Sequence, residues 1–250
     1  MGESVENNSK IILGIPGIWQ DRQAFKEKFN ESQQEFVYLG EHHIGKLQTP
    51  KYLYQIEFVD EHIPYVAEAF KLGGNGSFTK GDIETLQSHR SMVYILAEGG
   101  SLEQVIEIMS VAKAVLQSGG LAVNVESSGK ATTKDNWIEY VNNGTENRAF
   151  AAFVQMSREE DVFYTCGMHN FGYKDLLTST SNTNPAETVE LFQTFCLYTL
   201  IDNPIFNSGE TFSVDPKAPV FQLRAESCVL FESDDPFYNP YGVWRLNKIS

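Results

Sequence analysis

The chain has 250 residues, 42% of them hydrophobic, and carries 33 acidic against 19 basic side chains for a formal net charge of -14. This length and composition are sufficient for a substantial hydrophobic core in one large domain or two small ones. Because so negative a protein repels phosphate backbones and anionic headgroups, we expect neither nucleic acid nor a membrane as a partner. The acids are spread over both halves of the chain, which fits either a solvated surface or a face that attracts a basic protein.

The cysteines and the N-terminal segment indicate the cellular setting. Cys166, Cys196 and Cys228 are widely separated and lack the paired spacing of a zinc site, so we expect reduced thiols that pack in the core. No basic region followed by an apolar stretch opens the chain, and no segment approaches the roughly 18 apolar residues that a membrane span requires. We therefore expect a cytoplasmic protein with a disordered N-terminus over residues 1–9.

Residues 10–97 show alternating strand and helix patterns. The predicted elements are a buried strand at 11–15, a helix at 20–29, strands at 36–44 and 52–59, a helix from Pro64 to Gly73, a short helix at 80–89 and a buried strand at 92–96. The order strand, helix, strand, strand, helix, strand matches a split β-α-β unit of the ferredoxin-like type.

Residues 98–250 repeat this order after one additional helix. Ser101 and Gln104 form a capping-box pattern, and one apolar face extends behind them to Leu116. The elements that follow are a strand at 121–126, a helix at 133–141, strands at 149–156 and 161–166, a helix at 185–200 with Asn184 as its cap, a strand at 219–224 and a strand near 243–246.

The repeated order predicts an α+β fold of two ferredoxin-like (βαββαβ) layers, each a mostly antiparallel sheet covered by helices, packed together. The first unit is expected at 10–97. The second is expected at 98–250, with a C-terminal extension rich in aromatic and acidic residues. Since no proline-rich linker separates the two units, we expect them to share an interface.

The segment from Glu126 to Thr132 follows a predicted strand and precedes a predicted helix, a setting in which backbone amides and a lysine hold phosphate groups. A P-loop requires glycine where Asn124 stands and serine or threonine where Ala131 stands. The sequence therefore favours a plain turn with a threonine helix cap over nucleotide binding. Lys130 remains a candidate for binding a carboxylate or a small anion.

His169 and Asn170 follow the predicted strand at 161–166 and are flanked by two glycines. One hypothesis makes His169 a general base, with Asn170 as an oxyanion donor and Cys166 or Ser128 as the nucleophile. The other makes His169 a structural residue that fixes the loop. Because the pattern lacks the neighbours of a nucleophile elbow or a cysteine-protease site, we assign no catalytic residue and keep His169 and Asn170 as binding candidates.

The C-terminal extension contains two carboxylates and three aromatic rings in close succession: Asp234, Asp235, Phe237, Tyr238 and Tyr241. Interfaces favour aromatic residues, and carboxylates steer basic partners, so one hypothesis is a recognition loop. The alternative is a loop that folds back, so that its rings cover the end of a sheet.

Four residues are of types that bind metal ions: Glu41, His42, His43 and His62. Their spacing is not a ligand signature, and adjacent residues on a strand point to opposite faces. We therefore predict no metal site and no cofactor.

Three motifs resemble a bacterial family catalogued as domain of unknown function 4261: Gly-Gly-Ser at 99–101, Ser-Gly-Lys-Ala at 128–131 and Gly-Met-His-Asn-Phe-Gly at 167–172. The similarity is strongest from Met92 to Leu200, and the first ninety residues match only in element order. The family has no established activity. The resemblance implies a bacterial cytosolic protein, with some relatives that look like members of toxin and immunity neighbourhoods.

Two functional hypotheses follow. The favoured one is an acidic protein-binding module for a basic protein, with an immunity protein that neutralises a basic toxin as its sharper form. The alternative is a small-molecule hydrolase or transferase that uses His169 with Lys130 or Ser128. It requires the turn after the strand at 121–126 to lie beside the end of the strand at 161–166. The oligomeric state stays open, with a homodimer as one alternative.

Overall fold

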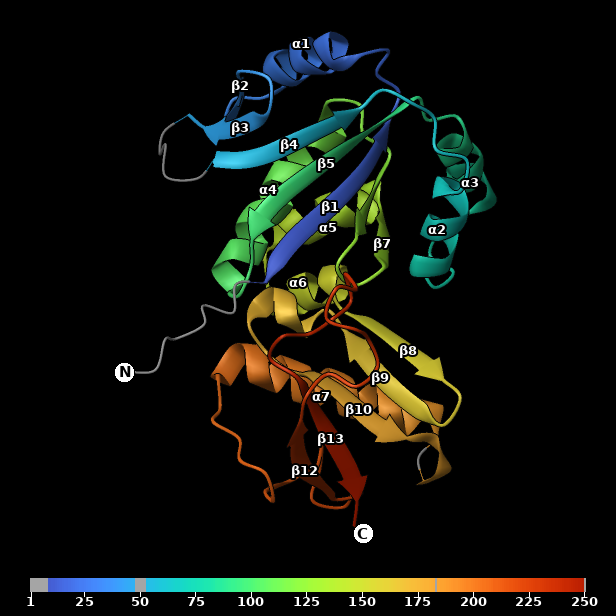
Figure 1. Ribbon diagram of the computed structural model, residues 1–250, viewed down its shortest axis with the longest axis vertical. Helices are drawn as coiled ribbons and strands as arrows, with labels where there is room; N and C mark the ends of the chain where they lie inside the picture. The colour runs from blue at the N-terminus through green and yellow to red at the C-terminus, as the bar shows by residue number, and fades with distance from the viewer. Residues whose placement is uncertain (1–8, 48–52, 183, 250) are drawn as a thin grey trace.

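The computed structural model describes residues 9–47, 53–182 and 184–249, which form two β-sheets stacked end to end (Figure 1). The strands of the first, sheet A, are β1 (Lys10–Gly17), β2 (Phe36–Leu39), β3 (His43–Lys46), β4 (Leu53–Val59), β5 (Ser91–Glu98), β6 (Ala122–Val125) and β7 (Lys130–Thr133). They lie in the order β2-β3-β4-β5-β1-β6-β7, and each neighbouring pair is antiparallel.

The second sheet, sheet B, is mixed. Its strands are β8 (Gln155–Glu159), β9 (Val162–Cys166), β10 (Asp175–Ser179), β11 (Thr211–Phe212), β12 (Phe221–Glu226) and β13 (Val243–Lys248). Their order is β11-β12-β13-β10-β9-β8, and β10 and β13 form the one parallel pair between these strands.

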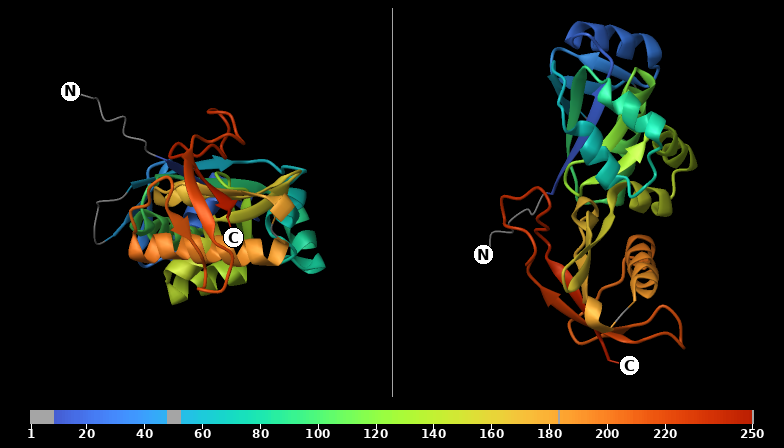
Figure 2. Two further views of the ribbon diagram at one scale, coloured as in Figure 1. Left: turned by 90° about the horizontal axis from the view of Figure 1, so that it is seen from below. Right: turned by 90° about the vertical axis from the view of Figure 1, so that its right-hand side faces the viewer.

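Seven α-helices are present in the described part of the chain: α1 (Arg22–Ser32), α2 (Val66–Gly73), α3 (Lys80–Gln87), α4 (Leu102–Gln117), α5 (Lys134–Asn143), α6 (Glu146–Phe153) and α7 (Pro185–Asp202). Helices α4 and α5 cover one face of sheet A, and α2 and α3 cover part of the other (Figures 1 and 2). Helix α7 lies on one side of sheet B. The fold is therefore α+β, as predicted.

Local sequence explains the best-defined elements. Ile11, Leu13 and Ile15 alternate along β1 and are fully buried on the face that meets the core. Ser101 caps α4 by accepting a hydrogen bond of 3.2 Å from the backbone N–H of Gln104, and Asn184 caps α7 in the same way. These three elements confirm the corresponding predictions.

Three predicted elements differ in the structure. The strand expected at 36–44 is a hairpin of β2 and β3 that turns near Gly40, whose φ is 62°. Residues 149–153, expected as strand, belong to α6, because its short apolar run fits either periodicity. Lys130 begins β7, so the turn at 126–129 connects two strands, and α5 starts after the cap residue Thr133.

The ferredoxin-like topology is not confirmed. The strands that flank α2 and α3 are β4 and β5, and these lie side by side and antiparallel, whereas a split β-α-β unit separates two parallel strands by a third. Strands β6 and β7 join sheet A through β1, so the boundary predicted at residue 97 cuts through this sheet. The predicted disordered segment lies outside the described residues except for Ser9, which is buried.

Candidate functional site

The turn between β6 and β7 lies against the segment that follows β9. The Ser127 hydroxyl donates to Oδ1 of Asn170 at 2.9 Å, a contact between residues 43 positions apart. The Cys166 Sγ lies 3.8 Å from the Ser127 carbonyl oxygen. The condition set by the catalytic hypothesis, that these two segments meet, is therefore fulfilled.

The Gly-Gly-Ser motif joins them from the start of α4. The backbone N–H of Gly100 donates to the carbonyl oxygen of Asn170 at 2.8 Å, and that of Gly99 donates to Ser9 at 2.7 Å. A Cβ at Gly172, whose φ is 86°, would clash with the carbonyl oxygen of Gly100. All three motifs that resemble the family thus converge on one place between the two sheets.

Residues Met168–Phe171 form a single 3-10 turn, η1, and all four are buried. Gly167 precedes the turn with a φ of 123°, and a Cβ there would clash with the carbonyl oxygen of Phe153. Only glycine permits this approach, so the flanking glycines hold His169 and Asn170 inside the molecule rather than on a projecting loop.

Asp175 organises the polar groups around η1. Its Oδ1 accepts hydrogen bonds from the Thr165 hydroxyl at 2.9 Å and the Met168 backbone N–H at 3.1 Å. Its Oδ2 accepts one from the Asn239 side chain at 2.6 Å and lies 3.7 Å from Nδ1 of His169. Asp175 and Asn239 are not among the residues predicted from the sequence. The sequence signal for Asp175 is a carboxylate at the start of the apolar strand β10, since a buried carboxylate requires hydrogen-bond partners.

His169 is 2% exposed, yet neither ring nitrogen has a hydrogen-bond partner among the described residues. The distance to Asp175 exceeds hydrogen-bonding range. The hydroxyl of Ser9, which is 5% exposed, likewise has no partner in this part of the chain. Because buried polar groups are nearly always hydrogen-bonded, these two side chains indicate a place where a water or a ligand belongs.

A cavity of about 390 Å³ lies at this place. Its lining comes from the start of β1, the turn at 126–129, η1 and the segment between β12 and β13: Ser9, Lys10, Ile12, Ser127, His169, Ser233, Asp235, Pro236, Tyr238 and Pro240. Of the predicted binding residues, His169, Asp235 and Tyr238 line this cavity, and Asn170 supports it through Ser127.

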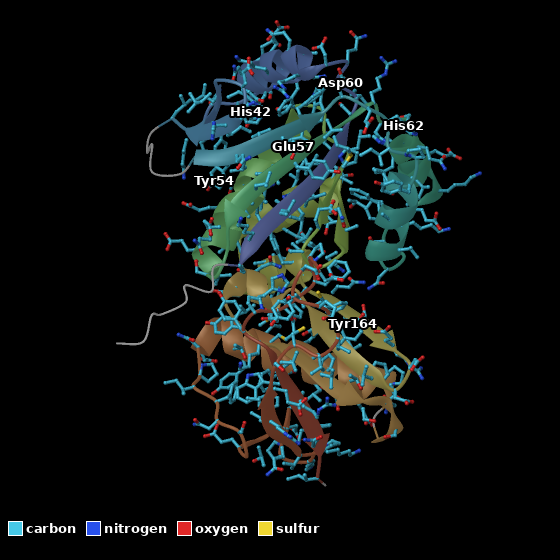
Figure 3. The ribbon with its side chains drawn as sticks, viewed as in Figure 1. His42, Tyr54, Glu57, Asp60, His62 and Tyr164 are labelled. Atoms are coloured by element: carbon cyan, nitrogen blue, oxygen red, sulfur yellow. The ribbon has the colours of Figure 1, made fainter. Side chains whose placement is uncertain are left out.

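The segment at 227–242, here called the C-terminal loop, folds back over sheet B on the side opposite α7 (Figure 2). The ring of Phe237 packs on the turn at Gly129 and meets Phe231 edge to face at 5.5 Å. Phe231 in turn contacts Tyr164 on β9, which Figure 3 labels, at 5.9 Å. The rings thus cover the sheet, as the second hypothesis for this loop predicts.

The carboxylates of the C-terminal loop have different surroundings. Asp234 is exposed, whereas Asp235 is half-buried and its Oδ1 accepts a hydrogen bond from the Phe237 backbone at 2.8 Å. Tyr238 and Tyr241 are half-buried. The loop therefore presents the Asp234 carboxylate to solvent, whereas Asp235 and the two tyrosine rings are partly covered by the protein.

Several titratable groups near the site are desolvated. Burial lowers the pKa of the Lys130 ammonium group, raises that of the Glu126 carboxyl and raises that of the Cys166 thiol. Cys166 is therefore a protonated thiol and a weak nucleophile. Lys130 does not line the cavity around His169.

The groups that the catalytic hypothesis requires are engaged elsewhere. The Asn170 side chain donates to the Gly167 carbonyl at 2.9 Å and accepts from Ser127, and it is fully buried and absent from the cavity lining, so it is not placed to stabilise an oxyanion there. The Ser128 hydroxyl accepts from the Lys130 backbone at 3.4 Å. Within the described residues, no hydrogen bond joins His169 to Ser128, Cys166 or Lys130.

Two other regions contain residues that could form a site. Figure 3 shows His42 beside β3 and His62 beside α2, on opposite flanks of sheet A. Throughout residues 9–47, 53–182 and 184–249, no group of three or more histidine, cysteine or acidic side chains is placed to hold a metal ion. A larger cavity of about 630 Å³ beside α5 contains Lys134, but its ammonium group already donates to the carbonyls of Leu116 and Gly120. The smaller cavity has the unsatisfied groups and is the better candidate.

Residues 164–247 match the family model described as domain of unknown function (DUF4261). The match covers 84 of the 250 residues and supports the resemblance to this family. The DUF4261 match spans from β9 into β13, so it contains η1, Asp175 and the C-terminal loop. The resemblance placed at Met92 to Leu200 overlaps the match only over residues 164–200. No curated protein and no solved structure matches the chain.

Proposed function

We propose that the protein is an acidic protein-binding module for a basic protein, and that the partner contacts the C-terminal loop. The observation that carries the proposal is the combination of exposed carboxylates and anchored rings on this loop. Glu232 and Asp234 are exposed, and the segment 227–242 contains no lysine or arginine. Carboxylates in such a setting steer basic partners during encounter.

The loop is already ordered for binding. The backbone N–H of Asp235 donates to Glu232 at 3.0 Å, and that of Tyr238 donates to the Asp235 carbonyl at 3.0 Å. The Phe237 ring fixes the loop to the body of the protein at Gly129. Because a fixed loop has less conformational freedom to lose, association with a partner is favoured.

A basic toxin is the partner class that we favour, which makes the protein an immunity protein. This sharper form rests on the net charge of -14 and on the resemblance to a family with relatives in toxin and immunity neighbourhoods. A bacterial cytoplasmic location is part of the same proposal. Among the described helices, none combines the length and apolar composition needed to cross a membrane.

The test compares two charge-reversed variants that change the net charge equally. The loop variant carries Glu232→Lys and Asp234→Lys, and the control carries Glu159→Lys and Asp161→Lys at exposed positions of the β8–β9 hairpin. Tagged proteins are used to capture partners at low and high salt, and captured proteins are identified by mass spectrometry. We expect a stoichiometric basic protein that is released by salt, lost with the loop variant and retained by the control.

Capture of the same partner by the loop variant would place the interface elsewhere. Absence of any stoichiometric basic partner at low salt would contradict the proposed function as a whole.

A further inference from the structure

The cavity beneath the C-terminal loop contains polar side chains that a protein partner on the outer surface would not contact. It is lined by His169, whose ring nitrogens have no partner among the described residues, and by Ser9, whose hydroxyl has none there either. Both side chains are more than nine-tenths buried. Two unsatisfied side chains on one cavity indicate that a molecule with hydrogen-bonding groups occupies it.

Two opposite charges also line the cavity without pairing. Lys10 comes from the start of β1 and Asp235 from the C-terminal loop. Within the described part of the chain, the Lys10 ammonium group forms no ion pair, and the Asp235 side chain uses only Oδ1, which accepts the Phe237 N–H. Each charge is therefore available to an opposite charge on a ligand.

The size and the remaining lining restrict the ligand. About 390 Å³ lies at the lower end of the range for small-molecule sites. Hydroxyl groups of Ser233 and Tyr238 add donors and acceptors, whereas most of the exposed lining is apolar and includes Ile12 and two prolines. A small molecule that combines charged groups with an apolar part fits this lining.

We propose that this cavity binds a small zwitterion of the free α-amino acid class. The ligand ammonium group pairs with Asp235, the ligand carboxylate pairs with Lys10, and His169 and Ser9 hydrogen-bond to its polar atoms. An anion or a cation alone pairs with only one of the two lining charges, exposed Lys10 and half-buried Asp235, whereas a zwitterion pairs with both. The inference does not depend on the proposed protein partner.

Asp175 places a fixed carboxylate beside this site. Its Oδ2 lies 3.7 Å from Nδ1 of His169, and three hydrogen bonds from other groups fix the carboxylate. The imidazole therefore lies near a negative charge that does not itself line the cavity.

The test is calorimetric titration of the full chain with each of the twenty amino acids. Each amino acid that binds is compared with its N-acetyl derivative and its amide, which lack one of the two charges. We expect saturable binding of at least one amino acid. We expect the dissociation constant to rise at least about tenfold for both derivatives, since a charged hydrogen bond is worth about 1.5–3 kcal/mol.

Variants of the protein assign the contacts. Asp235→Asn and Lys10→Met are each expected to raise the dissociation constant at least about tenfold. Asp234→Asn is the matched control, because Asp234 is adjacent, exposed and absent from the cavity lining, and its affinity should equal that of the unchanged protein. In NMR spectra the His169 imidazole signals should shift on ligand addition, and those of exposed His42 should not.

Three results would overturn the inference: no saturable binding of any amino acid at millimolar concentration, equal binding of the singly charged derivatives, or equal weakening by Asp234→Asn and Asp235→Asn. If titration fails while the charge-reversed loop variant still loses its protein partner, the ligand site is refuted and the proposed function remains.

Discussion

Two regions of the molecule each bury a histidine, and they treat it in opposite ways. At the corner formed by α2 and α3, His89 is 2% exposed, and both its ring nitrogens are bonded, to the Leu86 carbonyl at 2.7 Å and to the Ile63 N–H at 3.0 Å. Between the sheets, His169 is equally buried and neither nitrogen has a partner among the described residues.

The difference separates structural from functional use of one residue type. His89 completes the backbone hydrogen bonding of its own corner, so both of its ring nitrogens are used for structural hydrogen bonds. The flanking glycines hold His169 inside the molecule, its ring nitrogens have no hydrogen-bond partner among the described residues, and it lines a cavity. Burial alone does not distinguish the two, whereas hydrogen-bond partners do.

The largest effect is expected from Asp175→Ala, because the Asp175 carboxylate holds the region around His169 together. The substitution leaves three buried donors without their acceptor: the Thr165 hydroxyl, the Met168 backbone N–H and the Asn239 side chain. We expect a loss of about 3–5 kcal/mol in the free energy of unfolding, measured by urea denaturation. Asp161→Ala removes an exposed carboxylate of sheet B and should change that free energy by less than about 0.5 kcal/mol. Similar losses for both variants would show that Asp175 is not a structural centre.

An intermediate effect separates the two histidines directly. His89→Leu leaves the partly buried Ile63 N–H without its acceptor, so we expect a loss of about 1–3 kcal/mol in the free energy of unfolding. His169→Leu removes a side chain with no hydrogen bond among the described residues, so its change should stay under about 1 kcal/mol. Urea denaturation at pH 8 measures both, and the reverse order would contradict the comparison.

The smallest effect is a pH dependence of stability that arises from His89, at the corner formed by α2 and α3. Burial lowers the pKa of His89 below its ordinary value of 6.5, the Leu86 carbonyl opposes this, and His62 adds to it. The unfolded chain therefore binds the proton more readily than the folded protein. The stability that His89 contributes is complete above about pH 6.5 and is lost as the pH falls below that value.

Denaturation measured between pH 5 and pH 8 tests this dependence. His89→Leu should flatten the acidic part of the profile, whereas His42→Leu, at an exposed position, should leave it unchanged. An unaltered profile for His89→Leu would assign the pH dependence to other groups.

Sequence patterns predicted the elements whose signals are local. Helices α4 and α7 carry their own caps, Ser101 and Asn184, and β1 carries its own apolar alternation. The apolar run of α6 was predicted as a strand. Four or five consecutive apolar residues are compatible with both the helical and the strand period, so packing between the sheets determines which of the two forms.

The candidate site was predicted in part. His169, Asn170, Asp235 and Tyr238 were selected from composition and flanking residues, and they gather around one cavity or support it. Asp175 and Asn239 were not predicted, because the hydrogen bond between their side chains joins residues 64 positions apart. A single sequence carries no local signal for such a pair, and the same holds for the contact between Ser127 and Asn170.

The parallel pairing of β10 with β13 has a consequence for how a newly made chain acquires its shape. Sheet A has all its strands once residue 133 has left the ribosome, whereas sheet B waits for residues 243–248 to be inserted between β12 and β10. Until then β10 presents an open edge to other chains in the cell. The half of the protein that contains sheet B is therefore the last to become protected during synthesis, and a nascent chain stalled before residue 243 would expose it to aggregation.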